Sequence, residues 1–464
     1  MEEIKITSIL TTIALILIGV LLFELIIFIH EFGHFITAKK SGIKVNEFSL
    51  GMGPKIFSFG KGETKYSLRI FPIGGFCAME GEDEESPEPR AFNNAKVWKR
   101  MIVIIAGAVM NIILGFVLMF VVVVQQDSYS STEVQSFPAT SFSSCTGLQS
   151  GDVIKEINGY GISTSMDFNY PISTAKLKTV DGSTLEIYKE DCGNNLYNMA
   201  VKIVQDKNNK LSDETVSKVN ELLSKSSSEI VKANSKEDAY SIYEKYYKKI
   251  NDTCGIKNYK VEKIVEKETR KRYTADILVE RNGVEKLLKN VQFFTYTTKD
   301  NSDPQVSIDF YVKPIEKTFG SVLSQTFKQT ISTCKMIYAS LGGLLTGKFG
   351  LKDMSGPIGI ASAVTTVASE SLASGFMSAV NSIIYVMMII TVNLGLFNML
   401  PFPALDGGRF IFLIIEAIRG KSVPRKVEGI VNAIGMGLLI LLMIVITAND
   451  IFKLFWWFLW QVKE

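Results

Sequence analysis

Histidine is almost absent from this chain: only two of the 464 residues are histidines, and both fall within one short motif. Charge of one sign is also lacking, because 50 Lys and Arg residues nearly balance 47 Asp and Glu residues. That balance creates no basic field for nucleic acid, so we expect no nucleic-acid partner. The five cysteines are too few for a disulfide-built scaffold. A metal site here would need acidic or thiol ligands besides the two histidines.

Long apolar runs are what the sequence does contain. They lie at 9–29, 101–124, 376–400 and 429–447, and each is long enough for a membrane-spanning helix of about 20 residues. Buried core helices are the alternative, but four runs of this length favour membrane spans. The first run is not typical of a cleavable signal peptide, because it continues straight into a polar motif. The sequence therefore predicts an α-helical polytopic membrane protein with about four spans.

The distribution of Lys and Arg predicts the orientation of these spans. Basic residues gather in 35–100 and again in 401–428, and short loops rich in Lys and Arg face the cytoplasm. By alternation, the N-terminus and the long 125–375 region are expected outside. The chain is thus expected to be a multi-pass protein of a cytoplasmic membrane, with the inner ends of its spans near both basic loops.

Both histidines belong to the motif His30-Glu31-Phe32-Gly33-His34 at the inner end of the first span. Residues four apart share a helix face, so the two imidazoles can bind one Zn²⁺. The intervening Glu31 can take a proton from a water activated there. A chance match, or two histidines at a helix interface, is the alternative interpretation.

A catalytic zinc needs a third protein ligand and an open position. No third histidine exists, so that ligand must be Asp, Glu or Cys, and Asp406 is the best candidate. It follows the third span at the same expected depth as the histidines, after a bend rich in proline and glycine. A helix cap is the alternative role for Asp406. The amides of Asn393 and Asn398, within that span, could hold a substrate backbone or only pack.

Residues 42–80 alternate polar and apolar side chains between glycines, which predicts strands and tight turns. A free strand edge beside a membrane site could hold an unwound peptide by strand addition, and an ordinary hairpin is the alternative. Further along, Gly147–Gly159 and the Asn282-Gly283 hairpin signal indicate a small β-rich outer module.

A polar stretch at about 172–272 interrupts this module and is interpreted as a helical insertion. Cys192 and Cys254 flank it, and a disulfide between them is a hypothesis. Residues 319–350 are amphipathic and are expected to lie along the membrane surface, and 355–359 is expected to form a turn.

Two stretches far apart in sequence now form one pattern: His30–His34, and Asn398–Gly408 of the form N-x-x-P-x-P-x-L-D-G-G. Together they resemble the site-2 protease family of intramembrane zinc metalloproteases, most closely its RseP-like bacterial branch with an outer PDZ domain. The 48–54, 69–75 and 147–159 stretches also match. Ala108 departs from the pattern, because a proline usually stands there, and the insertion splits the single visible PDZ module.

The resemblance implies that His30, His34 and Asp406 bind zinc and that Glu31 activates water. It implies that Asn393, Asn398, Gly51 and Gly53 help to position the substrate strand. Expected substrates are single-pass membrane proteins already trimmed outside the membrane, such as anti-sigma factors or signal-peptide remnants. The PDZ-like module is expected to be extracytoplasmic, with the active site near the cytoplasmic side of the lipid bilayer.

The expected organisation follows the motifs in order. It comprises a first span with the histidine motif (1–41), a β-hairpin region and cytoplasmic loop (42–97), a second span (98–125), a PDZ-like α+β domain with its insertion (126–315), an amphipathic connection (316–375), a third span with its loop (376–428) and a fourth span (429–464). The main rival function is a catalytically silent relative that binds membrane segments as a regulator. A metal transporter is a weaker rival, because the other spans lack further ligand pairs.

Overall fold

The computed structural model describes residues 2–461, apart from 61, 83, 138–140, 174–184, most of 191–263, 271, 299–300, 307, 348–349, 351–353 and 355. The chain divides into two compact units. The first comprises Met1–Gln126 and Val322–Glu464, and the second comprises Asp127–Ser321. Each unit is described by itself below.

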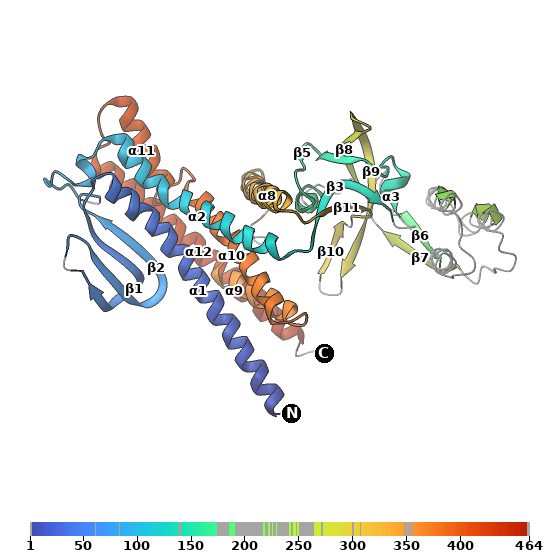
Figure 1. Cartoon of the computed structure of the whole chain (residues 1–464), viewed down its shortest axis with the longest axis horizontal. Coiled ribbons are helices and arrows are strands. Elements are labelled where there is room, and N and C mark those ends of the chain that lie inside the picture. Colours follow the sequence, from blue (N-terminus) through green and yellow to red (C-terminus); the bar gives the residue numbers. More distant parts are fainter. Residues whose placement is uncertain are drawn as a thin grey trace. The chain divides into compact units, whose positions relative to one another are not determined.

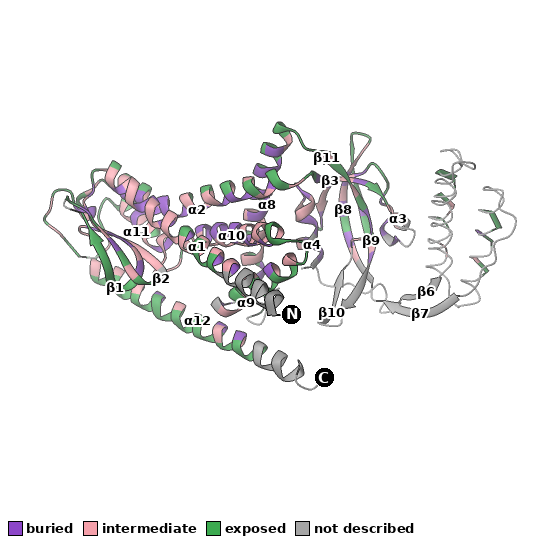
Figure 2. Ribbon diagram, turned by 60° about the horizontal axis from the view of Figure 1, so that its bottom comes forward, coloured by how far each residue is buried: buried purple, intermediate pink, exposed green. Residues whose placement is uncertain are grey.

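Long apolar helices dominate the first unit. These are α1 (Glu2–Lys40), α2 (Val97–Gln125), α10 (Phe376–Asn398) and α12 (Arg425–Gln461). All four contain a stretch long and apolar enough to cross a membrane, which confirms a multi-pass membrane protein with four candidate spans. Figure 1 shows α1, α2 and α10 running alongside one another, and α12 lies along the same bundle. Most described α12 side chains are exposed (Figure 2), as lipid-facing positions of a membrane helix would be.

Small residues let the inner helices approach closely. A Cβ built on Gly33 of α1 would lie 2.5 Å from the Ala106 carbonyl oxygen of α2. A Cβ on Gly395 of α10 would lie 2.9 Å from the Ala108 carbonyl oxygen. Backbone contact of this kind is how membrane helices gain packing energy, since lipid offers no hydrophobic drive for helix association.

The region after α1 forms an antiparallel sheet from β1 (Val45–Phe59) and β2 (Lys65–Met79). Strands were expected there, and they are longer than the short segments anticipated. Residues 47–50 pair on one side with 75–78 and on the other with 65–68, while 57–59 pair with 66–68. The sheet therefore has four short strand segments in the order 75–78, 47–50, 65–68 and 57–59. Residues 75–78 form one edge and residues 57–59 form the other.

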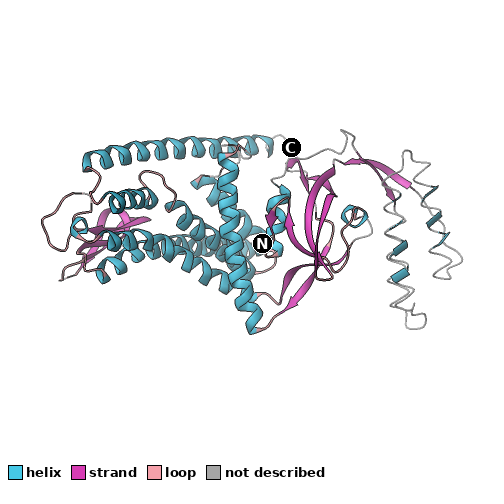
Figure 3. Cartoon of the chain, turned by 90° about the horizontal axis from the view of Figure 1, so that it is seen from above, coloured by secondary structure: helices cyan, strands magenta, loops and turns pink. Residues whose placement is uncertain are grey.

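Three further helices follow in the C-terminal part of the chain, and Figure 1 labels them: α8 (Phe319–Leu345), α9 (Pro357–Leu372) and α11 (Asp406–Arg419). Figure 3 distinguishes helices (cyan) from strands (magenta). The turn expected at 355–359 is the start of α9, because Gly356 has extended backbone angles and Pro357 suits the first helical turn. The loop expected after the third span contains α11, which ends at Gly420 in a left-handed conformation (φ 67°).

Near the start of α9, the Asp450 carboxylate of α12 accepts hydrogen bonds from the Gly356 and Gly359 amides at 2.9 and 2.8 Å. Asp450 is only 3% exposed, so these amides supply the partners that a buried acid requires. The contact ties α12 to α9.

The second unit is built on an antiparallel sheet in the order β10-β9-β8-β4-β3-β11, with β5 beside β4. Its strands are β3 (Ser128–Ser136), β4 (Val153–Ile157), β5 (Tyr160–Gly161), β8 (Arg272–Arg281), β9 (Val284–Thr298), β10 (Asn301–Val306) and β11 (Tyr311–Glu316). Two short helices, α3 (Phe142–Cys145) and α4 (Asn169–Ser173), accompany it. Ile154, Ile157, Ile277 and Phe293 are fully buried in its core.

Two local features fix this sheet. The expected hairpin joins β8 and β9, and Asn282 and Gly283 both have positive φ angles (54° and 77°), as a tight turn of this type requires. Asp152, which is fully buried, accepts two hydrogen bonds from Arg281 at 2.6 and 2.7 Å. The guanidinium also reaches the Gly147 carbonyl, so the ion pair joins the start of β4 to the end of β8.

The interruption of this unit lies between α4 and β8. Its described part includes a two-stranded ribbon of β6 (Leu185–Glu190) and β7 (Ile264–Arg270). Most of the expected helical insertion, and both cysteines of the disulfide hypothesis, lie outside the described residues.

Candidate metal centre

The two histidines of α1 and Asp406 of α11 meet inside the first unit. The Asp406 Oδ2 atom lies 3.2 Å from His30 Nε2 and 3.4 Å from His34 Nε2. The two Nε2 atoms are 3.3 Å apart. Ligand atoms at about 2.0–2.2 Å around a tetrahedral zinc are separated by about 3.3–3.6 Å, so the three separations lie within about 0.1 Å of the range for one zinc ion.

Neighbouring polar groups, one from the backbone and one from a side chain, orient both imidazoles. His34 Nδ1 lies 2.8 Å from the Val103 carbonyl oxygen, to which it donates a hydrogen bond, leaving its Nε2 lone pair for the centre. His30 Nδ1 lies 3.3 Å from the Asn111 amide, whose Oδ1 receives no hydrogen bond among the described residues. Exchanging the two ends of this amide would let His30 Nδ1–H donate to Oδ1 and leave the His30 Nε2 lone pair for the centre.

Gly107 of α2 closes the site on the side of the imidazoles. A Cβ at this position would lie 2.4 Å from His34 Nε2 and 2.7 Å from His30 Cε1. Only a glycine at position 107 allows both imidazole rings to keep their present positions. Gly107, Asn111 and Gly115 recur every four residues along this helix, which is typical of a face for close packing, and the first of them lies against both imidazoles.

Asp406 is the first residue of α11, and it is positioned by a tight turn after α10. The turn is possible because two glycines follow the carboxylate. A Cβ on Gly407 would lie 2.1 Å from the Leu400 carbonyl oxygen, and one on Gly408 would lie 2.4 Å from that of Phe402. The carboxylate Oδ2 is buried and receives no hydrogen bond of ordinary geometry from the described residues. A buried carboxylate oxygen facing two imidazole nitrogens is an arrangement that a cation would satisfy.

Glu31 lies on α1 between the two histidines, beside the sheet edge at 75–78. Its carboxyl group lies near the Cys77 backbone amide, and a Cβ on Gly75 would lie 3.4 Å from its Cγ. The strand edge nearest Glu31 is therefore that of β2. Gly75 and Cys77 were not singled out from the sequence, although the Gly74-Gly75 pair inside a strand signals a close backbone approach.

The four residues expected to position the substrate occupy different places. Asn398 Nδ2 lies 3.2 Å from His30 Nε2, at the centre itself. Asn393 makes no hydrogen bond to the three ligands in the described part of the chain, and its place on α10, five residues earlier, points to another face. Gly51 and Gly53 have positive φ angles (79° and 86°) and pack against Phe71 of the neighbouring strand.

The residues present thus fit a zinc site that can perform hydrolysis. Two imidazoles and one carboxylate are a known ligand set for catalytic zinc, and within the described residues no other cluster of three such side chains forms a possible metal site. A carboxylate follows the first histidine directly, as in zinc peptidases. Fold and site together define a membrane metallopeptidase.

Comparison of the sequence with known proteins also indicates a membrane metallopeptidase. The model of peptidase family M50 matches residues 18–442, and the chain belongs to this family of site-2 zinc metalloproteases. The chain is 30% identical over 455 residues to zinc metalloprotease RasP of Geobacillus kaustophilus, covering 94% of this chain and 97% of the relative. It is 30% identical over 464 residues to the regulator of sigma-W protease RasP of Bacillus subtilis, covering 94% and 98%. Zinc is the cofactor, and the chain is a zinc metallopeptidase.

Proposed function

We propose that this chain is an intramembrane endopeptidase that cuts single-pass membrane proteins whose outer parts have already been removed. One observation carries the proposal: His30, His34 and Asp406 present three ligand atoms within 3.4 Å of one another between membrane helices. In this proposal they hold the zinc ion, and Glu31 is the general base.

The chain's own residues have defined parts in the proposed reaction. Zinc, when bound, polarises the scissile carbonyl and makes water acidic enough to deprotonate near neutral pH. Glu31 accepts the proton of the attacking water and later donates it to the leaving amine. The Cys77 backbone amide lies beside the Glu31 carboxyl on the sheet edge. Asn398 lies close enough to the centre to donate to the developing oxyanion.

The edge at 75–78 is the surface on which we place the substrate. A peptide bond within a helix has its carbonyl engaged in a helical hydrogen bond, so the substrate segment must unwind first. An unwound segment then needs partners for its backbone, and a strand edge supplies them by strand addition. Gly75 leaves room for such a segment beside Glu31. Gly51 and Gly53 act indirectly, by allowing the bend of β1 that keeps residues 47–50 paired with this edge.

The location and the substrates follow from charge and from the relatives. The basic 35–100 and 401–428 regions support an active site near the cytoplasmic face of a bacterial membrane, with the second unit outside as a PDZ-like filter. The Bacillus subtilis relative is named as a regulator of sigma-W. That name supports anti-sigma factors as one substrate class, and signal-peptide remnants are a second with the same single-pass form.

The test co-expresses the chain with single-pass membrane proteins that lack their outer domains, and measures cleavage by immunoblot. Three forms are compared: the parent, Glu31→Gln and Asp406→Ala. We expect cleavage by the parent alone, zinc retained by Glu31→Gln, and zinc lost by Asp406→Ala. Uncut substrates with zinc bound to every form would favour the regulatory relative. Equal cutting by the parent and Glu31→Gln would refute Glu31 as the base.

A further inference from the structure

The segment that carries Asp406 has few internal hydrogen bonds. Between α10 and α11 it contains Pro401 and Pro403, which have no amide hydrogen to donate. The Phe402 and Leu405 amides bond locally, to the Leu400 and Phe402 carbonyl oxygens. The Met399 and Leu400 amides donate back to the Leu396 and Phe397 carbonyl oxygens of α10. The remaining amide donates to an element outside α10, this segment and α11, so the position of the turn depends in part on that element.

That remaining amide belongs to Ala404, and it donates to Asn432 Oδ1 of α12 at 3.3 Å. Ala404 also has a left-handed backbone (φ 73°). The other three described non-glycine residues with positive φ are all asparagines, whose side chains tolerate this conformation. For alanine it costs on the order of 1 kcal/mol and persists only where surrounding contacts impose it. Asn432 makes such a contact two residues before Asp406.

A second contact between α12 and this turn requires glycine. A Cβ on Gly435 would lie 2.4 Å from Pro403 Cβ and 2.6 Å from the Pro403 carbonyl oxygen. Gly437, two residues later on the same helix, has no such neighbour within 4 Å. Helix α12 therefore approaches the turn at backbone distance through one face only, which is the face that carries Asn432 about one turn earlier.

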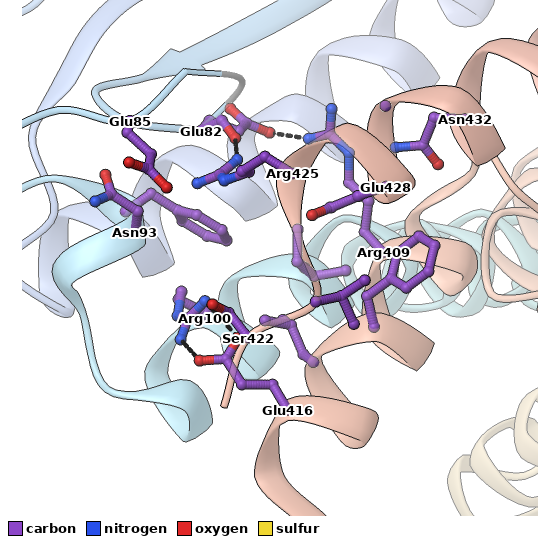
Figure 4. A pocket seen from close by; sticks show the side chains of 16 residues that line it. Glu82, Glu85, Asn93, Arg100, Arg409, Glu416, Ser422, Arg425, Glu428 and Asn432 are labelled. Atoms are coloured by element: carbon purple, nitrogen blue, oxygen red, sulfur yellow. Dashed lines mark hydrogen bonds and ion pairs between the residues drawn. The ribbon is translucent and has the colours of Figure 1, made fainter. Parts of the chain in front are cut away.

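The helices on both sides of the turn are also held to one loop. Arg409 of α11 pairs with Glu82, and Arg425 at the start of α12 donates to the Glu82 carbonyl oxygen at 2.7 Å. These side chains and Asn432 line a polar cavity of about 450 Å³ (Figure 4). The starts of α11 and α12 are thus fixed to the same point, which limits how far α12 can move from the turn that it contacts.

We infer that Asn432 is a positioning residue for the metal ligand Asp406, and that Gly435 is the residue that allows it to act. Asn432 holds the Ala404 amide in the orientation that directs the next turn of chain, and so the carboxylate, towards the two imidazoles. The inference rests on Asp406 being a zinc ligand, as proposed above. Removing a group that holds a metal ligand in position typically lowers metal affinity or activity by about 10–100-fold.

The experiment uses the purified full-length protein in detergent. The variants are Asn432→Ala, Asn432→Asp, Gly435→Ala and the matched control Gly437→Ala. Zinc affinity is measured by competition with a chromophoric chelator, and ligand geometry from the visible spectrum of the cobalt(II)-substituted protein. Cleavage of a model transmembrane substrate separates kcat from KM, and circular dichroism with thermal unfolding reports the fold.

We expect Asn432→Ala and Gly435→Ala to raise the zinc Kd by about tenfold or more, to alter the cobalt spectrum and to lower kcat with little change in KM. Asn432→Asp keeps an acceptor oxygen and should retain the parental spectrum. Gly437→Ala should match the parent throughout.

Parental zinc affinity and cobalt spectrum in Asn432→Ala would overturn the inference, as would loss of both in Asn432→Asp. Asp406→Ala is measured alongside. If it binds zinc as tightly as the parent, the proposed ligand set is wrong. If it loses zinc while Asn432→Ala does not, only the positioning role fails.

Discussion

Gly107→Ala gives the sharpest test of the metal centre, because it changes neither charge nor a proposed ligand. The new Cβ would lie 2.4 Å from His34 Nε2, whereas ordinary contact begins at 3.4 Å. The imidazole or the α2 backbone must therefore move by about 1 Å, several times the tolerance of about 0.2 Å in zinc–ligand distances. We expect a fall in zinc affinity of about 100-fold and loss of peptidase activity, with helix content unchanged.

Gly115→Ala is the matched control for this change. Its Cβ would lie equally close, at 2.4 Å, to Val392 Cγ2 of α10, far from any imidazole. Overpacking of this kind costs about 1–3 kcal/mol, so both variants should unfold at similarly lowered temperatures. Zinc content by mass spectrometry and thermal unfolding are measured for both. Normal zinc binding by Gly107→Ala, or equal zinc loss in Gly115→Ala, would refute the view that Gly107 shapes the ligand positions.

Three further predictions concern parts that support the site or the second unit. Asp450→Ala leaves the Gly356 amide without its partner and should lower the free energy of unfolding of the detergent-purified protein by about 2 kcal/mol or more. Asp450→Asn keeps an acceptor oxygen, so its free energy of unfolding should fall less, and thermal unfolding compares the two variants. Asp152→Ala leaves Arg281 unpaired and should destabilise the second unit by about 3 kcal/mol, seen as faster proteolysis there than in the double variant Asp152→Ala/Arg281→Met. Burial opposes ionisation of Glu47, but hydrogen bonds from neighbouring lysine, serine and arginine side chains lower the pKa of this carboxyl to about 2. Its stabilising effect should be complete above about pH 4.5 and be lost as the pH falls towards 2, and Glu47→Gln should remove this pH dependence of proteolysis of the hairpin.

The three residues that we propose as metal ligands could be singled out from the sequence, and the structure brings them together. Histidines four apart share one helix face whatever surrounds the helix, so His30 and His34 follow from spacing alone. Asp406 followed from the lack of a third histidine and from its expected depth in the membrane. The four spans followed from run length, which a membrane requires.

The strand edge that we propose for the substrate was not predictable in the same way. Gly51 and Gly75 are both glycines within predicted strands, so the sequence does not distinguish them. The register of the strands decides which one lies beside Glu31. That register contains several bulges, and each moves the pairing by a residue or more. Side chains alternate across a strand, so an unknown bulge leaves the facing residue undetermined. The positioning contact of Asn432 is likewise hidden, because nothing local to either segment indicates that α12 packs against the Ala404 turn.

The polar contacts of α12 explain why a mostly exposed helix carries asparagine and aspartate. Apolar side chains cannot fix its rotation or its register along the bundle, because lipid competes equally well for them. Directional hydrogen bonds can, and α12 makes them near both ends: Asn432 to the turn before Asp406, and Asp450 to the start of α9. About 18 residues separate the two, which is about 27 Å of helix and close to the thickness of the hydrocarbon core. The helix is therefore fixed by two contacts about 27 Å apart, and a change at the Asp450 contact would reach the turn before Asp406 through rotation or sliding of α12.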